Sequence, residues 1–274
     1  MRTTGPMLVA LALAGVVGIA TGQSRRPLVA AHRGGAALWP ENSLTAFLNA
    51  LALGVDLVET DVHLSADGAV VVLHDPVVDR TTTGTGAVRA LTAAELSRLR
   101  LRDADGRATD DSVPTLAQLL DLLGPAAVEL LLEIKVDDRS QPYAGIEDKV
   151  LALVRQRQMA GRVMIMAFER DTISRVRALD PAIRTVLLIG RGQVQRERVF
   201  PAESVKWGVG LGTTAVGFNH RLIDADVVAA CRKAGLRLAA WTPNTEPDIR
   251  RVVGLGADIV ISDRPDLARR LVGR

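Results

Sequence analysis

The chain has 274 residues, 48% of them hydrophobic and 3% aromatic, and a formal net charge of +3 at pH 7. A chain of this length and hydrophobic content can bury a large core, so one (β/α)-type domain or two small ones would fit. The scarcity of aromatic side chains argues against a nucleic-acid partner, because stacking on bases needs them. The single cysteine, Cys231, excludes an internal disulfide and a cysteine-rich zinc site.

The first 23 residues are typical of a targeting segment. An early arginine precedes an apolar run from Met7 to Ala20, and small residues follow up to Gly22. The run is short for a bilayer span and fits the apolar region of a secretory signal peptide. We therefore expect export to the periplasm or the medium, with a mature chain that begins near Gln23 and is not inserted in the membrane. An uncleaved N-terminal anchor is the alternative.

Short apolar runs then alternate with amphipathic stretches. Strands are predicted at residues 28–32, 56–62, 69–74, 128–135, 162–168, 184–190, 214–219, 236–241 and 258–262. Helices are predicted at 43–53, 115–123, 146–158, 171–179, 225–234 and 246–254. Near-continuous apolar strands separated by helices indicate a parallel sheet covered on both faces. Roughly eight repeats in about 250 residues favour a closed (β/α)₈ TIM barrel over an open sheet.

The number of predicted strands does not fit this barrel cleanly. The link between the second and third, residues 63–68, is too short for a crossover helix. Either that unit is irregular or one strand lies outside the barrel. Residues 79–114 read as a polar insertion over the barrel mouth, after the third strand, without a continuous apolar pattern for a core of their own. One domain at 28–274 with this insertion is the prediction.

Four of the predicted strands carry ionisable side chains near their ends. Strand side chains alternate between two faces, so Glu59 and Asp61 share one face with Leu57 and His63. In a (β/α)₈ barrel the catalytic groups gather at the carboxyl ends of the strands. The residues expected at this rim are His32, Arg33, Glu59, Asp61, His74, Asp75, Glu133 and Lys135.

These residue types predict metal-assisted attack on a phosphate ester. Glu59, Asp61 and Glu133 make a hard oxygen site suited to Ca²⁺ or Mg²⁺. The two histidines can exchange protons near neutral pH, and the two cations suit phosphate oxygens. Each feature alone is compatible with ordinary ion pairs or turns, and their convergence at one rim favours a site. We expect His63 to lie beyond the ligands, and His220 to be structural.

Motifs of a known family occur in order along the chain. They are HRG (32–34), PENS (40–43), VETDVHLSADG (58–68), LHDP (73–76), DRTTTGTG (79–86), LEIK (132–135), WTPN (241–244) and ISDRPD (261–266). Together they resemble the glycerophosphodiester phosphodiesterases, from about residue 28 to the C-terminus. The departures are small: Ser43, Ala167 and Pro243 replace the more usual residues.

The resemblance implies a TIM barrel of the phospholipase-C-like phosphodiesterase type. It also implies metal-dependent hydrolysis of glycerophosphodiesters to sn-glycerol 3-phosphate and an alcohol, usually with Ca²⁺ or Mg²⁺. His32 and His74 would be the acid–base pair, and Glu59, Asp61 and Glu133 the metal ligands. The implied substrate-binding residues are Arg33, Glu41, Lys135, Phe168 and Trp241, of which Glu41 would contact the metal or orient Arg33.

Two alternatives come from different classes of protein. A related barrel could act as a lysophospholipase D or a phospholipase-C-like phosphodiesterase on lipid substrates, although the insertion shows no amphipathic membrane-binding helix. A secreted binding protein could capture the same diesters without turnover, but it would be expected to lack one of the histidines or carboxylates. The sequence leaves open the alcohol, the metal, the roles of the two histidines, the nucleophile and the oligomeric state.

Overall fold

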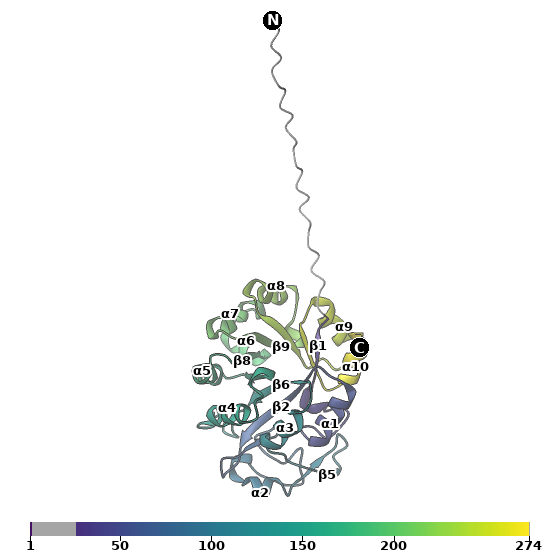
Figure 1. Cartoon of the computed structure of the whole chain (residues 1–274), viewed down its shortest axis with the longest axis vertical. Helices are drawn as coiled ribbons and strands as arrows, with labels where there is room; N and C mark the ends of the chain where they lie inside the picture. Colours follow the sequence, from purple (N-terminus) through teal and green to yellow (C-terminus); the bar gives the residue numbers. More distant parts are fainter. Residues whose placement is uncertain (2–25, 274) are drawn as a thin grey trace.

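The computed structural model describes residue 1 and residues 26–273, which form a barrel of parallel strands surrounded by helices (Figure 1). The predicted signal peptide lies outside the described residues. The barrel strands are β1 (Leu28–Ala31), β2 (Leu57–Leu64), β6 (Glu129–Ile134), β7 (Val163–Ala167), β8 (Arg184–Ile189), β9 (Ala215–Asn219), β10 (Arg237–Trp241) and β11 (Ile259–Ser262). Pairing of β1 with both β11 and β2 closes the ring, which confirms the predicted (β/α)₈ barrel.

The surplus strand lies outside the ring. β3 (Val70–Val72) pairs antiparallel with β2, with Val62 opposite Val72, because a link of a few residues can only make a hairpin return. This resolves the strand count in favour of one strand outside the barrel.

Helices cover the outside of the barrel. They are α1 (Leu44–Leu53), α3 (Leu116–Leu123), α4 (Ile146–Gln156), α5 (Arg170–Leu179), α6 (Arg191–Glu197), α7 (Pro201–Leu211), α8 (Ala225–Ala234), α9 (Glu246–Leu255) and α10 (Pro265–Leu271). All six helices predicted from the sequence are present, whereas α6, α7 and α10 were not predicted. Ser43 caps α1, because its hydroxyl accepts a hydrogen bond from the backbone N–H of Ala46 at 2.9 Å.

Two apolar layers explain the alternation along β2. Leu57 packs in the barrel interior with Leu131 and Met164, whereas Val58 and Val62 pack in the layer between strands and helices. The odd-numbered face of β2 therefore points into the barrel, which is the face that carries Glu59 and Asp61.

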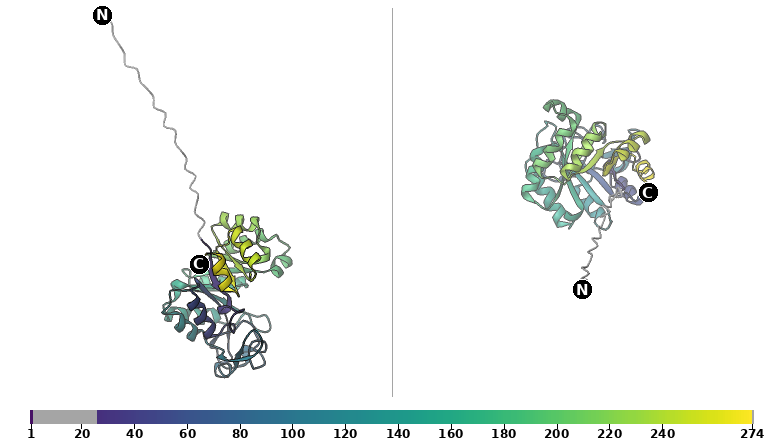
Figure 2. Two further views of the ribbon diagram at one scale, coloured as in Figure 1. Left: turned by 90° about the vertical axis from the view of Figure 1, so that its right-hand side faces the viewer. Right: turned by 90° about the horizontal axis from the view of Figure 1, so that it is seen from above.

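The insertion lies at one end of the molecule, around the labels α2 and β5 of Figure 1 and at the bottom of the left view of Figure 2. It contains α2 (Ala93–Leu96) and a hairpin of β4 (Arg100–Arg102) and β5 (Ala108–Ser112). The insertion packs against the segment that precedes it rather than around a core of its own. A small buried cluster combines residues of the insertion with side chains next to it, namely Val71, Leu73, Val78, Val88, Leu96, Leu101 and Val113. Within the insertion, Leu96 and Leu101 each stand between polar residues, so its sequence shows no continuous apolar pattern.

Among the described residues, no helix combines the length and apolar character that a membrane crossing requires.

Candidate active site

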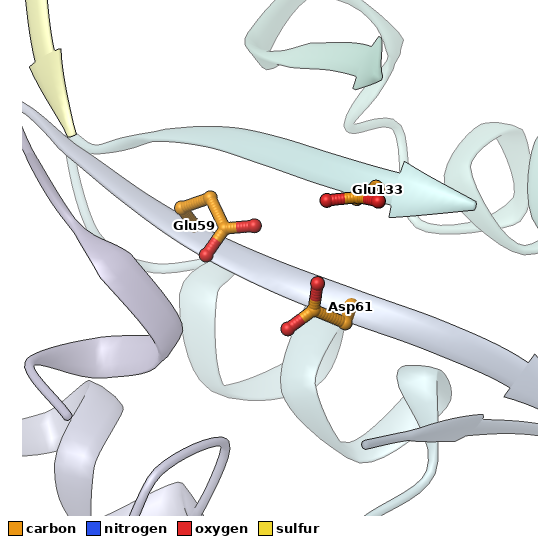
Figure 3. A group of neighbouring side chains, drawn as sticks. All are labelled: Glu59, Asp61 and Glu133. Atoms are coloured by element: carbon orange, nitrogen blue, oxygen red, sulfur yellow. The ribbon is translucent and has the colours of Figure 1, made fainter. Parts of the chain in front are cut away.

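Three carboxylates converge inside the carboxyl end of the barrel. Glu59 and Asp61 are two residues apart on β2, and the parallel pairing of β2 with β6 places Glu133 beside Asp61. All three side chains are buried, and one carboxylate oxygen from each lies within 4.8 Å of the other two. Figure 3 shows their carboxylates turned toward a common centre. The structure therefore brings the predicted ligands together.

Crowding and burial perturb these acids. Burial raises the pKa of Glu59 to about 8, and the charge of Asp61 adds to the effect. Burial also raises the pKa of Glu133. The pKa of Asp61 is lowered despite its burial, because Lys135, His74 and Arg33 favour its ionised form. The cluster thus concentrates more negative charge than its buried environment tolerates without a cation.

Two side-chain cations contact the carboxylates. The Nζ atom of Lys135 lies 2.7 Å from Oε1 of Glu133 and 3.1 Å from Oδ1 of Asp61. The Nε atom of Arg33 lies 3.5 Å from Oδ2 of Asp61, and its backbone N–H donates to Oε2 of Glu59 at 2.9 Å. Although burial opposes it, Asp61 and Glu133 raise the pKa of Lys135, so the ammonium stays charged.

The turn after β1 positions Arg33. Arg33 has φ of 51° and Gly34 has φ of 82°, both in the left-handed region. A Cβ at position 34 would lie 2.8 Å from Cβ of Ala46 on α1, so only glycine fits this close approach. The turn is the structural reason for the glycine of the HRG motif, because it directs the Arg33 side chain toward the acids.

His32 is held by a partner that the sequence analysis did not identify. Its Nδ1 lies 2.5 Å from Oδ1 of Asp263, directly after β11. The side-chain amide of Asn244 donates to the other oxygen of Asp263, and its Oδ1 accepts from the hydroxyl of Ser262 at 3.0 Å. Burial opposes ionisation of Asp263, but the hydrogen bond from His32 lowers its pKa overall. The other ring nitrogen of His32, Nε2, lies on the side of the acids, 3.8 Å from Oε2 of Glu59.

His74 has a similar arrangement. Its Nδ1 lies 2.7 Å from Oδ1 of Asp75. Its backbone carbonyl lies 3.1 Å from Nε2 of buried His63, whose Nδ1 lies 3.1 Å from the hydroxyl of Tyr143. His63 therefore supports the segment that carries His74, and it is not part of the cluster of Glu59, Asp61 and Glu133. Burial lowers the pKa of His63 to about 4, which keeps it neutral at pH 7.

The remaining polar partners lie behind the rim. Glu41 accepts a hydrogen bond from Nη1 of Arg33 at 3.0 Å and two from Arg80 of the insertion. Asn42 donates to Oδ2 of Asp61 at 3.0 Å and accepts from Thr60 at 2.9 Å. Of the two roles implied for Glu41, these contacts favour orientation of Arg33.

A cavity with an empty volume of about 450 Å³ opens over the acids. Phe168 and Trp241 form an apolar wall, with ring centroids 5.5 Å apart and an edge-to-face geometry. The indole N–H of Trp241 donates to the carbonyl of Gly217 at 3.0 Å, which fixes the ring. The ionisable side chains that line the cavity are His32, Arg33, Glu59, His74, Glu133 and Lys135.

Every residue predicted to bind metal or substrate is in this site or directly behind it. His220 is elsewhere: it is buried, with its Nδ1 3.6 Å from Asp248, which agrees with a structural role. The residues that sequence reasoning missed are Asn42, Arg80, Asn244 and Asp263. Each falls within a quoted motif, but a partner far along the chain determines its contacts.

The residues present fit a hard divalent cation. Oδ1 of Asp61 is buried and, apart from its 3.1 Å ion pair with Lys135, has no hydrogen bond among the described residues. In the described part of the chain, the three carboxylates contact two lysine or arginine side chains, Lys135 and Arg33. A Ca²⁺ or Mg²⁺ ion prefers such oxygen ligands and would offset the burial and the repulsion from Asp61, which together raise the pKa of Glu59.

Comparison with known proteins places this arrangement in context. A model of the glycerophosphoryl diester phosphodiesterase family matches residues 32–267. The glycerophosphodiester phosphodiesterase of Caldanaerobacter subterraneus subsp. tengcongensis is 32% identical over 250 residues, which cover 90% of this chain and 98% of that protein. The glycerophosphodiester phosphodiesterase of Bacillus subtilis is 29% identical over 262 residues, which cover 90% of this chain and 86% of the relative.

Solved structures show the same barrel. A glycerophosphodiester phosphodiesterase from Agrobacterium tumefaciens superposes with a TM-score of 0.73 at 27% identity, covering 89% of this chain and 99% of that one. A phosphodiesterase from Oleispira antarctica superposes with a TM-score of 0.76 at 26% identity, covering 90% of this chain and 97% of that one. The latter structure is a complex with the product sn-glycerol-3-phosphate.

Proposed function

Because the chain belongs to the glycerophosphoryl diester phosphodiesterase family, we propose that it hydrolyses glycerophosphodiesters to sn-glycerol 3-phosphate and an alcohol. The observation that carries the proposal is the pair of carboxylate-anchored imidazoles, His32 and His74, lining one cavity with the buried acids. The product bound to the Oleispira antarctica relative supports the same substrate class.

Glu59, Asp61 and Glu133 would hold the divalent ion. When bound, a Ca²⁺ or Mg²⁺ ion supplies positive charge that polarises the phosphate and stabilises the charge developing on it. Arg33 and Lys135 line the same cavity and add fixed positive charge for the phosphate oxygens. Phe168 and Trp241 offer an apolar wall for the carbon skeleton of the substrate.

The two histidines would move the protons. Asp263 and Asp75 each hold a histidine through Nδ1, which leaves Nε2 available for exchange in each case. One Nε2 takes the proton of the nucleophile, and the other donates a proton to the leaving alkoxide. The nucleophile is either a hydroxyl of the substrate's glycerol or a water molecule.

An assay of the purified protein tests this function. Glycerophosphocholine, glycerophosphoethanolamine and a lysophospholipid are offered separately, with Ca²⁺ and Mg²⁺ in turn. We expect release of choline or ethanolamine from the two glycerophosphodiesters. Turnover of the lysophospholipid alone would instead favour the lipid phosphodiesterase, and binding without turnover would favour a capture protein.

We also propose that the protein is exported. The support is the apolar run before Gln23, which precedes the first barrel strand by only a few residues. Mass spectrometry of the protein from its native cells should find a mature N-terminus near Gln23 in the exported fraction. Recovery of the full-length N-terminus on cytosolic protein would overturn the export assignment.

A further inference from the structure

We infer that Arg80, in the insertion, is a positioning residue that joins the two sides of the catalytic site. The inference rests on the proposed function, because it concerns how the residues of that reaction are held. Arg80 contacts Asp75, the partner of His74, and Glu41, the partner of Arg33. One guanidinium thereby connects the proposed proton-transfer group with the phosphate-binding cation.

The contacts use the fork geometry of arginine. Toward Asp75, Nε donates to Oδ2 at 2.6 Å and Nη2 to Oδ1 at 3.1 Å. Toward Glu41, Nη1 donates to Oε2 at 2.9 Å and Nη2 to Oε1 at 2.8 Å. Such paired bonds fix both the position and the plane of each carboxylate, which a lysine ammonium cannot do for two carboxylates at once.

Each carboxylate passes the constraint on to a residue of the cavity. Oδ1 of Asp75 lies 2.7 Å from Nδ1 of His74, and Oε1 of Glu41 accepts from Nη1 of Arg33 at 3.0 Å. Burial opposes ionisation of Glu41, but the hydrogen bonds from Arg80 and the charge of Arg33 lower its pKa overall. Without Arg80, Asp75 and Glu41 would each lose two charge-assisted hydrogen bonds. His74 and Arg33 would then be less well oriented.

Arg80 acts through these partners and does not face the reaction. Neither Arg80 nor Glu41 is among the described residues that line the reaction cavity. Both instead line a neighbouring cavity together with Trp39, Thr81 and Arg102. The Arg80 side chain is 50% exposed, so its replacement should not open a hole in the barrel core.

The fold of the insertion holds the turn that carries Arg80. Val78 and Thr82 flank it, and both are buried. The Thr82 hydroxyl donates to the carbonyl of Val78 at 2.7 Å, and Arg102 donates to the carbonyl of Thr82 at 2.8 Å. The buried cluster that the insertion shares with Val71, Leu73 and Val78 thus has a role at the site, because Val78 anchors the start of the Arg80 turn in it.

The test compares Arg80→Gln, Arg80→Lys and a matched control, Arg100→Gln. Arg100 belongs to the same insertion and is exposed, and its side chain donates to the backbone carbonyl of Asp110 at 2.6 Å. With glycerophosphocholine as substrate, Arg80→Gln should lower kcat by roughly 10- to 100-fold, the usual cost of removing a group that orients a site residue. Arg80→Lys should recover part of the loss, and Arg100→Gln should stay near wild type.

A rescue experiment separates positioning from stability. The neighbouring cavity gives access to the space that Arg80→Ala would vacate, so millimolar guanidinium should raise the kcat of that variant, whereas ammonium should not. Equal kcat in Arg80→Gln and Arg100→Gln would overturn the inference. Arg80→Gln could lose kcat through instability alone. In that case the inference would be overturned if guanidinium did not raise the kcat of Arg80→Ala and Arg80→Lys had no higher kcat than Arg80→Gln. A wild-type protein inactive on every diester would instead contradict the proposed function itself.

Discussion

Replacing His32 or His74 with alanine should lower kcat by roughly 10² to 10⁴, the range of a positioned general acid or base. Each imidazole is held through Nδ1 by a carboxylate and lines the cavity above the acids. The KM should change less than kcat, because Arg33 and Lys135 remain to bind the phosphate. The double variant should lose far less than the product of the single losses, because both residues serve one transition state. Steady-state kinetics with glycerophosphocholine measures these changes.

Two other histidines provide controls. His220→Gln should leave kcat near wild type, because His220 pairs with Asp248 and does not line the cavity. His63→Gln should have an intermediate effect, because His63 contacts the backbone of His74 and not its ring. Near-normal turnover in His74→Ala together with a full loss in His63→Ala would show that the wrong histidine has been assigned to proton transfer.

Removing divalent ions with EDTA should abolish turnover, and Ca²⁺ or Mg²⁺ should restore it. The reason is the cluster of Glu59, Asp61 and Glu133, whose oxygens lie within 4.8 Å of one another and whose burial leaves their charge poorly compensated. Because a bound ion stabilises the folded state, Tm should rise with the concentration of the ion. At 100 times Kd the free energy of unfolding should be about 2.7 kcal/mol higher than without the ion.

Variants at the cluster separate binding from general stability. Asp61→Asn should remove both the activity and the ion-dependent rise in Tm. A matched control, Asp226→Asn on exposed α8 surface, should keep both. Full turnover by wild-type protein in metal-free buffer would contradict the metal assignment, whatever happens to Tm.

The sequence predicted the barrel and most of the site because these depend on short-range pattern. The alternation of side chains between the two faces of a strand was enough to place Leu57, Glu59 and Asp61 on one face of residues 57–64. The structure places that face inside the barrel. The rule that the carboxyl ends of parallel strands meet at one rim then brought in Glu133 and His32. His74 was predicted by the same rule but reaches the site in another way, because β3 returns antiparallel along β2. The helices α6, α7 and α10 were missed because their segments are short or rich in glycine and charge, with little apolar periodicity.

The residues that hold the site in place were beyond sequence reasoning. His32 and Asp263 are 231 positions apart, and only closure of the ring between β1 and β11 brings them together. Arg80 and Glu41 are 39 positions apart and meet because the insertion folds back over the rim. Side-chain pairs of this kind depend on tertiary geometry that no local pattern contains. The sequence therefore predicted the candidate reacting groups and the supporting residue Glu41, but not the roles of Asn42, Arg80, Asn244 and Asp263.

The identity of the phosphorus-containing product tests the central claim most directly. Glycerophosphocholine is incubated with the purified protein and Ca²⁺ or Mg²⁺, and the products are identified by ³¹P NMR. Cleavage of the bond between phosphorus and the choline oxygen should yield sn-glycerol 3-phosphate and free choline. Phosphocholine and glycerol as products, or no turnover with either ion, would contradict the assignment.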